Sequence, residues 1–283
     1  MASKSANLFR IALSFLIFLQ IFLSAPASAE GNGLPQKFEA NYKLEVFGIT
    51  LAHATHSLER TKSCLSMKVS TYPVGWLAFL YDGKVDIRSD IKQDDGQLLL
   101  VNHDYTHVDG SEESEASTVR YDINWLNNPE KKPEVNATGI YKGEKISLNS
   151  DKPIWDPLSI QAIMIINADK KTASYEHGLL MKGELKNYLF ENQGKETIKL
   201  NGTDYSALKT VVKEAEKNRV IYVWMLPEYH NIPVKYEHWK DGELKSTLWL
   251  QSATFENNGV TRTLTLTDSS KDEDVETNMY DDY

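Results

Sequence analysis

Apolar and polar residues alternate with a period of two along much of this chain. In residues 38–46 every second residue is apolar and the residues between are polar, and a similar alternation returns in residues 118–125, 232–236 and 244–250. Successive side chains of a β-strand point to opposite faces of the sheet, so this pattern is typical of strands with one buried face and one face in water. The chain is therefore predicted to be rich in half-buried strands.

Dipeptides that favour tight turns separate the predicted strands. Asp or Asn followed by Gly supplies the positive backbone φ angles that two-residue hairpin turns require. Short strands joined in this way form an antiparallel meander, in which each strand pairs with the next one along the chain. The dipeptides are Asp82-Gly83, Asp95-Gly96, Asp109-Gly110, Asn201-Gly202, Asp241-Gly242 and Asn258-Gly259.

One segment departs from the alternation and is predicted to form a helix. It opens with Asp156, a residue type that caps helices, and continues with Pro157, which the first helical turn tolerates. The apolar residues that follow recur at the spacing of one helical stripe, which predicts a helix of about 11 to 13 residues. These residues are Leu158, Ala162, Ile165 and Ile166.

Residues 30–267 are expected to form a single mainly β domain. No long linker rich in Gly, Ser or Pro divides them, so one continuous sheet is favoured over two independent domains. We expect a large antiparallel meander that curls into an open barrel or a strongly curved sheet, with the one short helix plugging or flanking it.

Residues 1–29 have the order of a secretory signal peptide. Two basic residues precede an apolar run at residues 11–23, and small residues at Ala27 and Ala29 favour cleavage before Glu30. The apolar run, of about 13 residues, is shorter than the roughly 20 residues that a membrane-spanning helix needs. The sequence therefore predicts a periplasmic protein that has no transmembrane anchor after cleavage.

Acidic residues outnumber basic ones, and many of them gather at the end of the chain. The formal net charge is −9, and residues 268–283 hold seven acidic residues against one Lys. A segment of this composition buries little surface, so we expect a disordered acidic tail. A net negative protein is repelled by phosphate backbones, so nucleic acid is not an expected partner.

Several short segments follow one another in a characteristic order along the chain. They are Phe38-Glu39-Ala40-Asn41-Tyr42, Tyr72-Pro73-Val74-Gly75-Trp76, Asp86-Ile87-Arg88-Ser89, Tyr121-Asp122-Ile123-Asn124-Trp125, Asp156-Pro157-Leu158-Ser159, Tyr222-Val223-Trp224-Met225-Leu226-Pro227 and Ile232-Pro233-Val234-Lys235-Tyr236. Over residues 36–255 the series resembles a bacterial exported family catalogued as domain of unknown function 3108. The resemblance implies a β-rich envelope protein whose strands wrap into an open barrel, with no established activity and no catalytic residues to carry over.

The histidines lack the spacing of a metal site. His53 and His56 would point to opposite faces of a strand, and about 13 Å would separate His103 from His107 at the rise of a strand. The compact ligand spacing of zinc sites is absent from the sequence. We therefore expect structural or surface histidines, and neither a metal nor a cofactor.

Patterns for nucleophilic catalysis are also absent from the sequence. There is no Gly-x-Ser-x-Gly motif, and Ser159 follows the helix cap, where completing the first helical turn is its expected role. Cys64 is the single cysteine, so it cannot form an internal disulfide, and its alternating surroundings predict a small packed residue. No catalytic residue is therefore assigned.

Residues 220–226 are apolar on both faces of the predicted strand. The odd positions from 221 to 225 point one way and the even positions from 222 to 226 point the other, and nearly all of them are apolar or aromatic. Both faces must leave water, so the sheet is expected to curl over this strand or to pack the helix against it. If the sheet curls, one face lines the interior as an apolar groove. The predicted ligand-lining residues are Trp76, Tyr222, Trp224 and Leu226.

Two functions from different classes follow from these patterns. The first is an exported periplasmic protein that binds a cell-envelope component without catalysis, namely a lipid, a glycan or another envelope protein. The alternative is an envelope hydrolase that uses acidic residues or histidines that no motif reveals. An apolar cavity favours binding, whereas a pocket in which titratable groups with shifted pKa values converge favours catalysis.

Overall fold

A computed structural model of the chain describes residues 33–75, 78, 83–94, 97–108, 119–126, 134–141, 143–150, 153–169, 174–181, 183–214 and 217–266. All of these except Gly33 belong to one compact unit that begins at Leu34. The predicted signal peptide and acidic tail lie outside the described residues. In chain order the elements are β1 (Lys37–Val46), β2 (Ile49–Arg60), β3 (Cys64–Pro73), β4 (Lys84–Asp94), β5 (Gln97–Val108), β6 (Val119–Leu126), β7 (Glu134–Tyr141), β8 (Glu144–Ser150), β9 (Ile154–Trp155), α3 (Ser159–Asn167), β10 (Ser174–Met181), β11 (Glu184–Leu200), β12 (Thr203–Glu214), β13 (Arg219–Leu226), the 3₁₀ turn η1 (Pro227–Tyr229), β14 (Ile232–Lys240), β15 (Glu243–Asn257) and β16 (Val260–Thr265).

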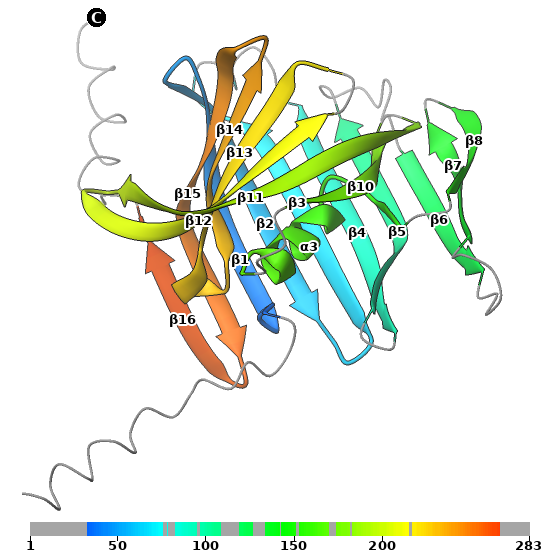
Figure 1. Ribbon diagram of the computed structural model, residues 1–283, viewed down its shortest axis with the longest axis horizontal. Coiled ribbons are helices and arrows are strands. Elements are labelled where there is room, and N and C mark those ends of the chain that lie inside the picture. The colour runs from blue at the N-terminus through cyan, green and yellow to red at the C-terminus, as the bar shows by residue number, and fades with distance from the viewer. Residues whose placement is uncertain are drawn as a thin grey trace, which may run out of the picture. The chain divides into compact units, whose positions relative to one another are not determined.

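The described strands form one sheet of 16 strands, ordered β8-β7-β6-β5-β4-β3-β2-β1-β15-β14-β13-β12-β11-β10-β9, with β16 beside β15. Neighbours in this order are antiparallel, apart from the short β9, which runs parallel to β10. Most strands pair with the next one along the chain, and β1 pairs with β15, which joins the two halves of the sheet. The predicted antiparallel meander is therefore confirmed (Figure 1).

Burial along the strands follows the alternation in the sequence. In β1 the side chains of Phe38, Ala40 and Tyr42 are buried, while the residues between them are more exposed. Three of the predicted turn dipeptides have positive φ at both residues, which is the geometry of a tight hairpin turn. These are Asn201-Gly202, Asp241-Gly242 and Asn258-Gly259. The other three dipeptides lie wholly or partly outside the described residues.

The sheet curls until its two ends come into contact. The hairpin between β10 and β11 reaches across to β7 and β8, where a Cβ atom on Gly183 would lie 3.0 Å from the side chains of Tyr141 and Ile146. Gly183 also has a φ of +80°, so both the backbone angle and the close approach require glycine. The sheet is thus a nearly closed barrel, which confirms the predicted curling into an open barrel or strongly curved sheet (Figure 1).

Helix α3 lies inside the curled sheet and is shorter than predicted. It has nine residues, with Leu158 rather than Asp156 at its N-cap position. The Asp156 carboxylate nevertheless accepts hydrogen bonds from the N–H groups of Leu158 (2.7 Å) and Ser159 (3.0 Å), so Pro157 and Leu158 form a turn before the helix. Asp156 therefore satisfies N–H groups at the start of the helix, as predicted, but it does so from two residues before the N-cap position. Among the described residues no helix is long and apolar enough to cross a membrane.

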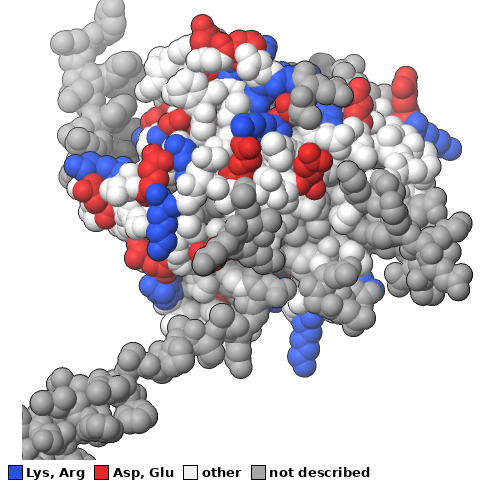
Figure 2. Space-filling model, viewed as in Figure 1, with Lys and Arg blue, Asp and Glu red and all other residues white. Residues whose placement is uncertain are grey.

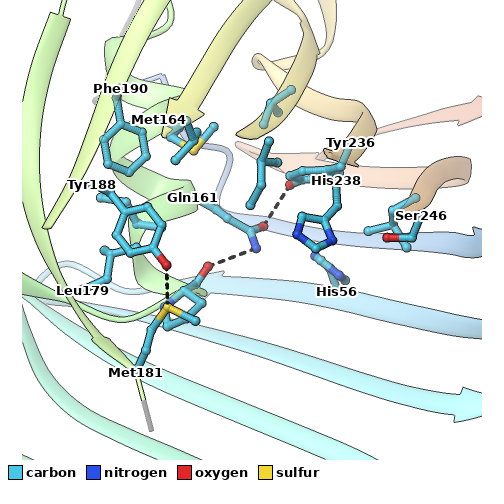
Figure 3. Close-up of a pocket in the computed structure, with 16 residues that line it drawn as sticks. His56, Gln161, Met164, Leu179, Met181, Tyr188, Phe190, Tyr236, His238 and Ser246 are labelled. Carbon is cyan, nitrogen blue, oxygen red and sulfur yellow. Dashed lines mark hydrogen bonds between the residues drawn. The ribbon is translucent and has the colours of Figure 1, made fainter. Parts of the chain in front are cut away.

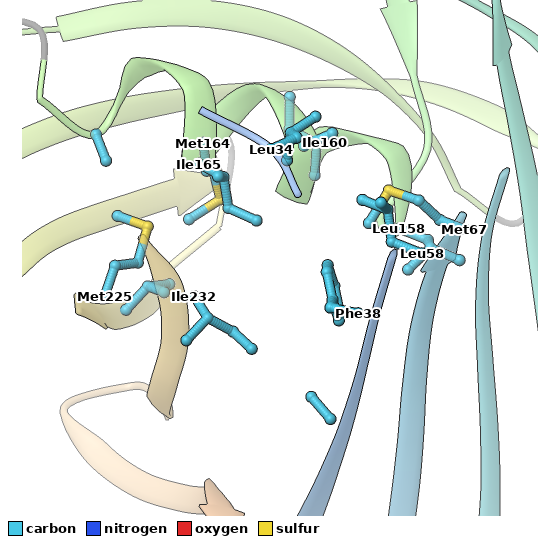
Figure 4. Close-up of a cluster of buried hydrophobic side chains, with 14 of the residues drawn as sticks. Leu34, Phe38, Leu58, Met67, Leu158, Ile160, Met164, Ile165, Met225 and Ile232 are labelled. Atoms are coloured by element: carbon cyan, nitrogen blue, oxygen red, sulfur yellow. The ribbon is translucent and has the colours of Figure 1, made fainter. Parts of the chain in front are cut away.

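Side-chain contacts fasten α3 to the sheet at both ends. At its start, the Ser89 hydroxyl of β4 donates to the Asp156 carboxylate (2.9 Å) and His103 Nδ1 of β5 lies 3.4 Å from it. At its end, the Asn231 amide donates to the Ile165 carbonyl (3.1 Å) and to the carboxylate of Asp169 (3.1 Å). Apolar side chains fill the interior beneath the helix (Figure 4). They include Leu34, Phe38, Leu58, Met67, Leu158, Ile165, Met225 and Ile232.

Candidate functional site

An interior pocket of about 310 Å³ lies between α3 and the curled sheet. This volume is at the lower end of the roughly 300–1,000 Å³ of small-molecule sites. The sixteen lining residues come from β2, from the segment that leads into α3, from α3 itself and from β10 to β15 (Figure 3). They are His56, Pro157, Ile160, Gln161, Met164, Leu179, Met181, Tyr188, Phe190, Val212, Ile221, Val223, Tyr236, His238, Ser246 and Leu248.

The pocket lies toward one end of the strands, which we call the pocket end. Here β10, β12 and β14 finish, and β11, β13 and β15 begin. Met181 is the last residue of β10, His238 is two residues before the end of β14, and Ser246 is three residues after the start of β15. The packed core of Figure 4 lies beneath α3, and Ile160 and Met164 of the helix belong both to this core and to the lining of the pocket.

Polar groups in the pocket are few, and several bond to one another. The Tyr236 hydroxyl donates to the side-chain oxygen of Gln161 (3.2 Å), and the Gln161 amide donates to the Pro157 carbonyl (3.4 Å). The Tyr188 hydroxyl donates to the Met181 sulfur (3.1 Å), as the dashed lines in Figure 3 show. These groups therefore offer a ligand little unused hydrogen-bonding capacity.

His56 is the most deeply buried titratable group of the pocket lining. Its imidazole lies against the ring of Tyr42, with 4.6 Å between the ring centroids. Burial lowers the pKa of His56 to about 4, and a hydrogen bond with Gln161 only partly opposes the decrease. His56 is therefore neutral at physiological pH.

The other titratable lining residues are neutral as well. Burial raises the pKa of Tyr188 to about 12 and raises that of Tyr236 well above its ordinary value. Burial, together with nearby Arg219 and Lys240, lowers the pKa of His238. A general acid or base works best with a pKa near the operating pH, and each of these pKa values moves away from neutrality. The lining thus suits ligand binding better than proton transfer.

Sequence reasoning missed the polar residues of this pocket. The sequence offers His56 only as one of two histidines with unsuitable spacing for a metal, and Gln161 lies within the predicted helix with no role assigned. The one available signal was Gln161 itself, a polar residue in the mostly apolar run of α3. Its partner Tyr236 lies 75 residues further along the chain, so no local pattern connects the two.

The predicted ligand-lining residues lie elsewhere or outside the described residues. On β13, Ile221 and Val223 line the pocket, whereas Tyr222, Trp224 and Leu226 do not. Trp224 is buried, and its ring lies between the ammonium groups of Lys209 (4.8 Å) and Lys235 (4.7 Å). Trp76 lies outside the described residues. A ligand-lining role for these four residues stays a prediction.

Lysine side chains therefore help to cover the outer face of β13. The sequence predicts instead that the curl of the sheet or the packed helix removes the faces of this strand from water. Lys209 on β12 lies directly opposite Trp224 on β13, which lies opposite Lys235 on β14. Each lysine also pairs with a glutamate, Lys209 with Glu196 (2.8 Å) and Lys235 with Glu237 (2.6 Å). Figure 2 shows acidic and basic side chains interspersed on one face of the molecule. The aliphatic parts of the lysines can shield the ring while their charges are paired.

Ser89, His103 and Asp156 also come together, but not as a catalytic triad. All three are buried, and both Ser89 Oγ (3.5 Å) and the Asp156 carboxylate (3.4 Å) approach the same nitrogen, Nδ1 of His103. In a triad the serine and the carboxylate contact different imidazole nitrogens. Burial raises the pKa of Asp156, but His103 and the hydrogen bonds to the carboxylate outweigh it and hold that pKa below its usual value. This cluster positions the start of α3.

Ser159 occupies the structural position expected of it, whereas Cys64 lies in a strand as predicted but is only partly buried. The Ser159 hydroxyl accepts a hydrogen bond from the Asp156 N–H (2.9 Å) at the start of the helix. Cys64 is the first residue of β3, and partial burial followed by the charge of Asp90 raises the pKa of its thiol. A thiol with a raised pKa is a poor nucleophile. No group of three or more metal-ligating side chains is present among the residues that the structure describes.

A second hollow, of about 370 Å³, lies on the outer face of β1 to β5. It is lined by hydroxyl groups and by charges of both signs, including Lys68, Arg88 and Asp104. Arg88 binds Asp90 through hydrogen bonds of 3.1 Å, which partly neutralises the charge there. None of the described residues that line this hollow is aromatic, so the mostly apolar and aromatic interior pocket is the stronger candidate for a small-molecule site.

Comparisons with known proteins support the fold and the family resemblance. The sequence model of a family described as "Protein of unknown function (DUF3108)" matches residues 37–248, which confirms the resemblance inferred from the sequence. No curated protein matches the chain. A solved structure described as a "Beta-barrel-like Protein of Domain of Unknown Function DUF1849 from Brucella abortus" is similar, with 10% sequence identity and a TM-score of 0.52, over 77% of this chain and 97% of that chain. At this identity the similarity supports the barrel-like fold alone.

Proposed function

The chain belongs to the DUF3108 family, which is described as having no known function, and from the geometry of its interior pocket we propose that it binds a lipid acyl chain in the bacterial cell envelope. The observation that carries the proposal is an interior pocket whose lining is mostly apolar and uncharged at neutral pH. The predicted signal peptide would export the protein to the periplasm, where envelope lipids are present.

The pocket favours an acyl chain over a glycan. A sugar loses hydrogen bonds to water when it is buried and needs replacements from the protein. In this pocket Tyr236 and Gln161 bond to each other, and Tyr188 bonds to Met181. An acyl chain needs no such replacement and gains free energy from every CH₂ group that leaves water, about 0.8 kcal/mol each. The small volume suits a single chain rather than a whole lipid.

The pocket also favours binding over hydrolysis. An ester or glycoside hydrolase needs a nucleophile or paired carboxylates near the scissile bond. No Asp, Glu or Cys is among the sixteen lining residues, and burial shifts the pKa values of the lining histidines below their ordinary value. Among the sixteen described lining residues, Ser246 alone carries an aliphatic hydroxyl.

Binding of a fluorescent fatty acid to the purified protein tests the proposal. Replacing Ser246, which lines the pocket, by Phe fills the cavity and should weaken binding by roughly tenfold or more. The matched control is the same substitution at Ser252 on the same strand, whose hydroxyl accepts a hydrogen bond from Asn41 and which does not line the pocket. Ser252→Phe should bind like the wild type. Absence of binding to the wild-type protein, or equal binding by Ser246→Phe, would contradict the proposal.

A further inference from the structure

The turn between β1 and β2 differs from the other tight turns described in this chain. Phe47 and Gly48 have φ angles of +52° and +78°, which match the +50° and +76° of Asn258 and Gly259 in the turn between β15 and β16. Asn and Asp tolerate this left-handed backbone region, whereas a bulky side chain is strained there. Phe47 therefore occupies a position where a polar residue would fold more easily.

Phe47 gains no packing in return for this strain. Its side chain is 86% exposed, and Ile49, the first residue of β2, is 53% exposed. Two further large apolar residues on the strands that flank this hairpin are also exposed: Tyr72 near the end of β3 (45%) and Leu244 near the start of β15 (40%). Strained residues that the fold does not need tend to mark functional sites.

This apolar tip, defined as Phe47, Ile49, Tyr72 and Leu244, lies at the pocket end. Strand β1 finishes at Val46 and pairs with the start of β15, where Glu45 lies opposite Thr247, the residue after the pocket-lining Ser246. In Figure 1 the β1–β2 hairpin stands beside the ends of β14 and β15 at the top of the view. A molecule that contacts the tip is therefore close to the part of β15 that lines the pocket.

We infer that the apolar tip inserts into the surface of a lipid bilayer and holds the pocket end against the membrane. The occupant is a bilayer rather than a protein because the tip is small. Whole aromatic side chains bury roughly 150–250 Å² each, but the side chains of the tip are only partly exposed. Together they offer roughly 340–560 Å² on that scale, which is less than the roughly 800 Å² that each partner buries in a stable protein interface. A bilayer needs only a few apolar side chains that reach the boundary between headgroups and acyl chains.

Apolar insertion rather than charge should drive this contact. The Lys43 ammonium next to the hairpin pairs with the Glu45 carboxylate (2.8 Å), and Lys245 near Leu244 pairs with Glu243. With its net charge of −9, the chain has no overall attraction for anionic lipids. The membrane would supply the acyl chain that the pocket binds, so this role of the apolar tip rests on the proposed function. Binding of the tip to a bilayer can be tested separately.

The test is flotation of the purified protein with phosphatidylcholine vesicles in low and high salt. Phe47→Asn places a residue suited to the left-handed backbone at the tip, so this variant should melt at the wild-type temperature or above it. It should nevertheless float with vesicles roughly tenfold less than the wild type, because the most exposed apolar side chain is lost. Salt should have little effect on the wild type.

A second pair of variants controls for general changes in surface hydrophobicity. Ile49→Thr removes an exposed apolar residue directly after the Phe47-Gly48 turn, and Val260→Thr does the same after the Asn258-Gly259 turn at the opposite end of the sheet. Ile49→Thr should lower flotation, and Val260→Thr should leave it unchanged. Equal flotation of Phe47→Asn and wild type, or no flotation of the wild type, would overturn the inference.

Two further measurements separate this inference from the proposed function. Phe47→Asn should bind the fluorescent fatty acid in solution as tightly as the wild type, because Phe47 is not a lining residue. Fatty-acid binding without vesicle flotation refutes the docking surface alone, and flotation without fatty-acid binding refutes the pocket alone. If sedimentation velocity shows a wild-type dimer that Phe47→Asn loses, the tip joins two copies of the chain, and the bilayer is the wrong occupant.

Discussion

Acid should destabilise the folded protein through His56, and the size of the effect follows from its burial. Burial lowers the pKa of this imidazole from 6.5 to about 4. Between these two pH values the unfolded chain binds a proton that the folded protein does not, so the free energy of unfolding decreases as the pH falls. At about 1.4 kcal/mol per pH unit, the loss reaches about 3 kcal/mol at pH 4 and is complete about one pH unit lower, below both pKa values.

Replacing His56 by Gln isolates this contribution, because Gln does not titrate. Urea unfolding of both proteins, followed by tryptophan fluorescence at several pH values from 7 to 4.5, gives the two stability curves. The wild type should lose about 2–3 kcal/mol more than His56→Gln over this range, whatever the difference between the two at pH 7. Other groups titrate in both proteins and cancel in the comparison. Parallel curves would show that His56 is not held neutral in the pocket, and the pocket would then be wetter or more polar than described.

Substitutions at three further positions test the structural assignments. Asp156→Ala should lower the free energy of unfolding by about 3–5 kcal/mol, because it removes the carboxylate that contacts His103 and accepts hydrogen bonds from N–H groups at the start of α3. Asp156→Asn should lower it by less in the same urea experiment. Trp224→Ala should cost about 3–5 kcal/mol, as for a packed tryptophan, and at a temperature where it stays folded it should bind the fluorescent fatty acid normally. Cys64→Ser should cost no more than about 1–2 kcal/mol, and a thiol reagent should modify native Cys64 slowly at neutral pH, because partial burial raises its pKa.

The architecture could be predicted from the sequence because its determinants are local. Alternation along β1 and the Asn-Gly and Asp-Gly turns specify antiparallel hairpins without reference to distant residues. The start of α3 was also foreseeable from Asp156, although its length was not. The helix begins only at Ser159 because the Asp156 carboxylate holds the intervening residues in a turn and also binds Ser89 of β4.

The site could not be predicted because it depends on which strands become neighbours. The sequence shows that both faces of β13 are apolar, but it does not show which of the two faces lines a pocket. The answer depends on Lys209 and Lys235, which the strand register places on either side of Trp224, so that Ile221 and Val223 face the pocket. The contact between Gln161 and Tyr236 is likewise created only by the curl of the sheet around α3.

Native mass spectrometry of the protein isolated from a bacterial host that exports it tests the central claim most directly. The wild type should retain a lipid or a fatty acid whose mass is released on denaturation, and Ser246→Phe, purified in parallel, should carry markedly less of it. A bare wild-type mass, a bound glycan in place of a lipid, or equal lipid on both proteins would contradict the claim that the interior pocket binds an acyl chain.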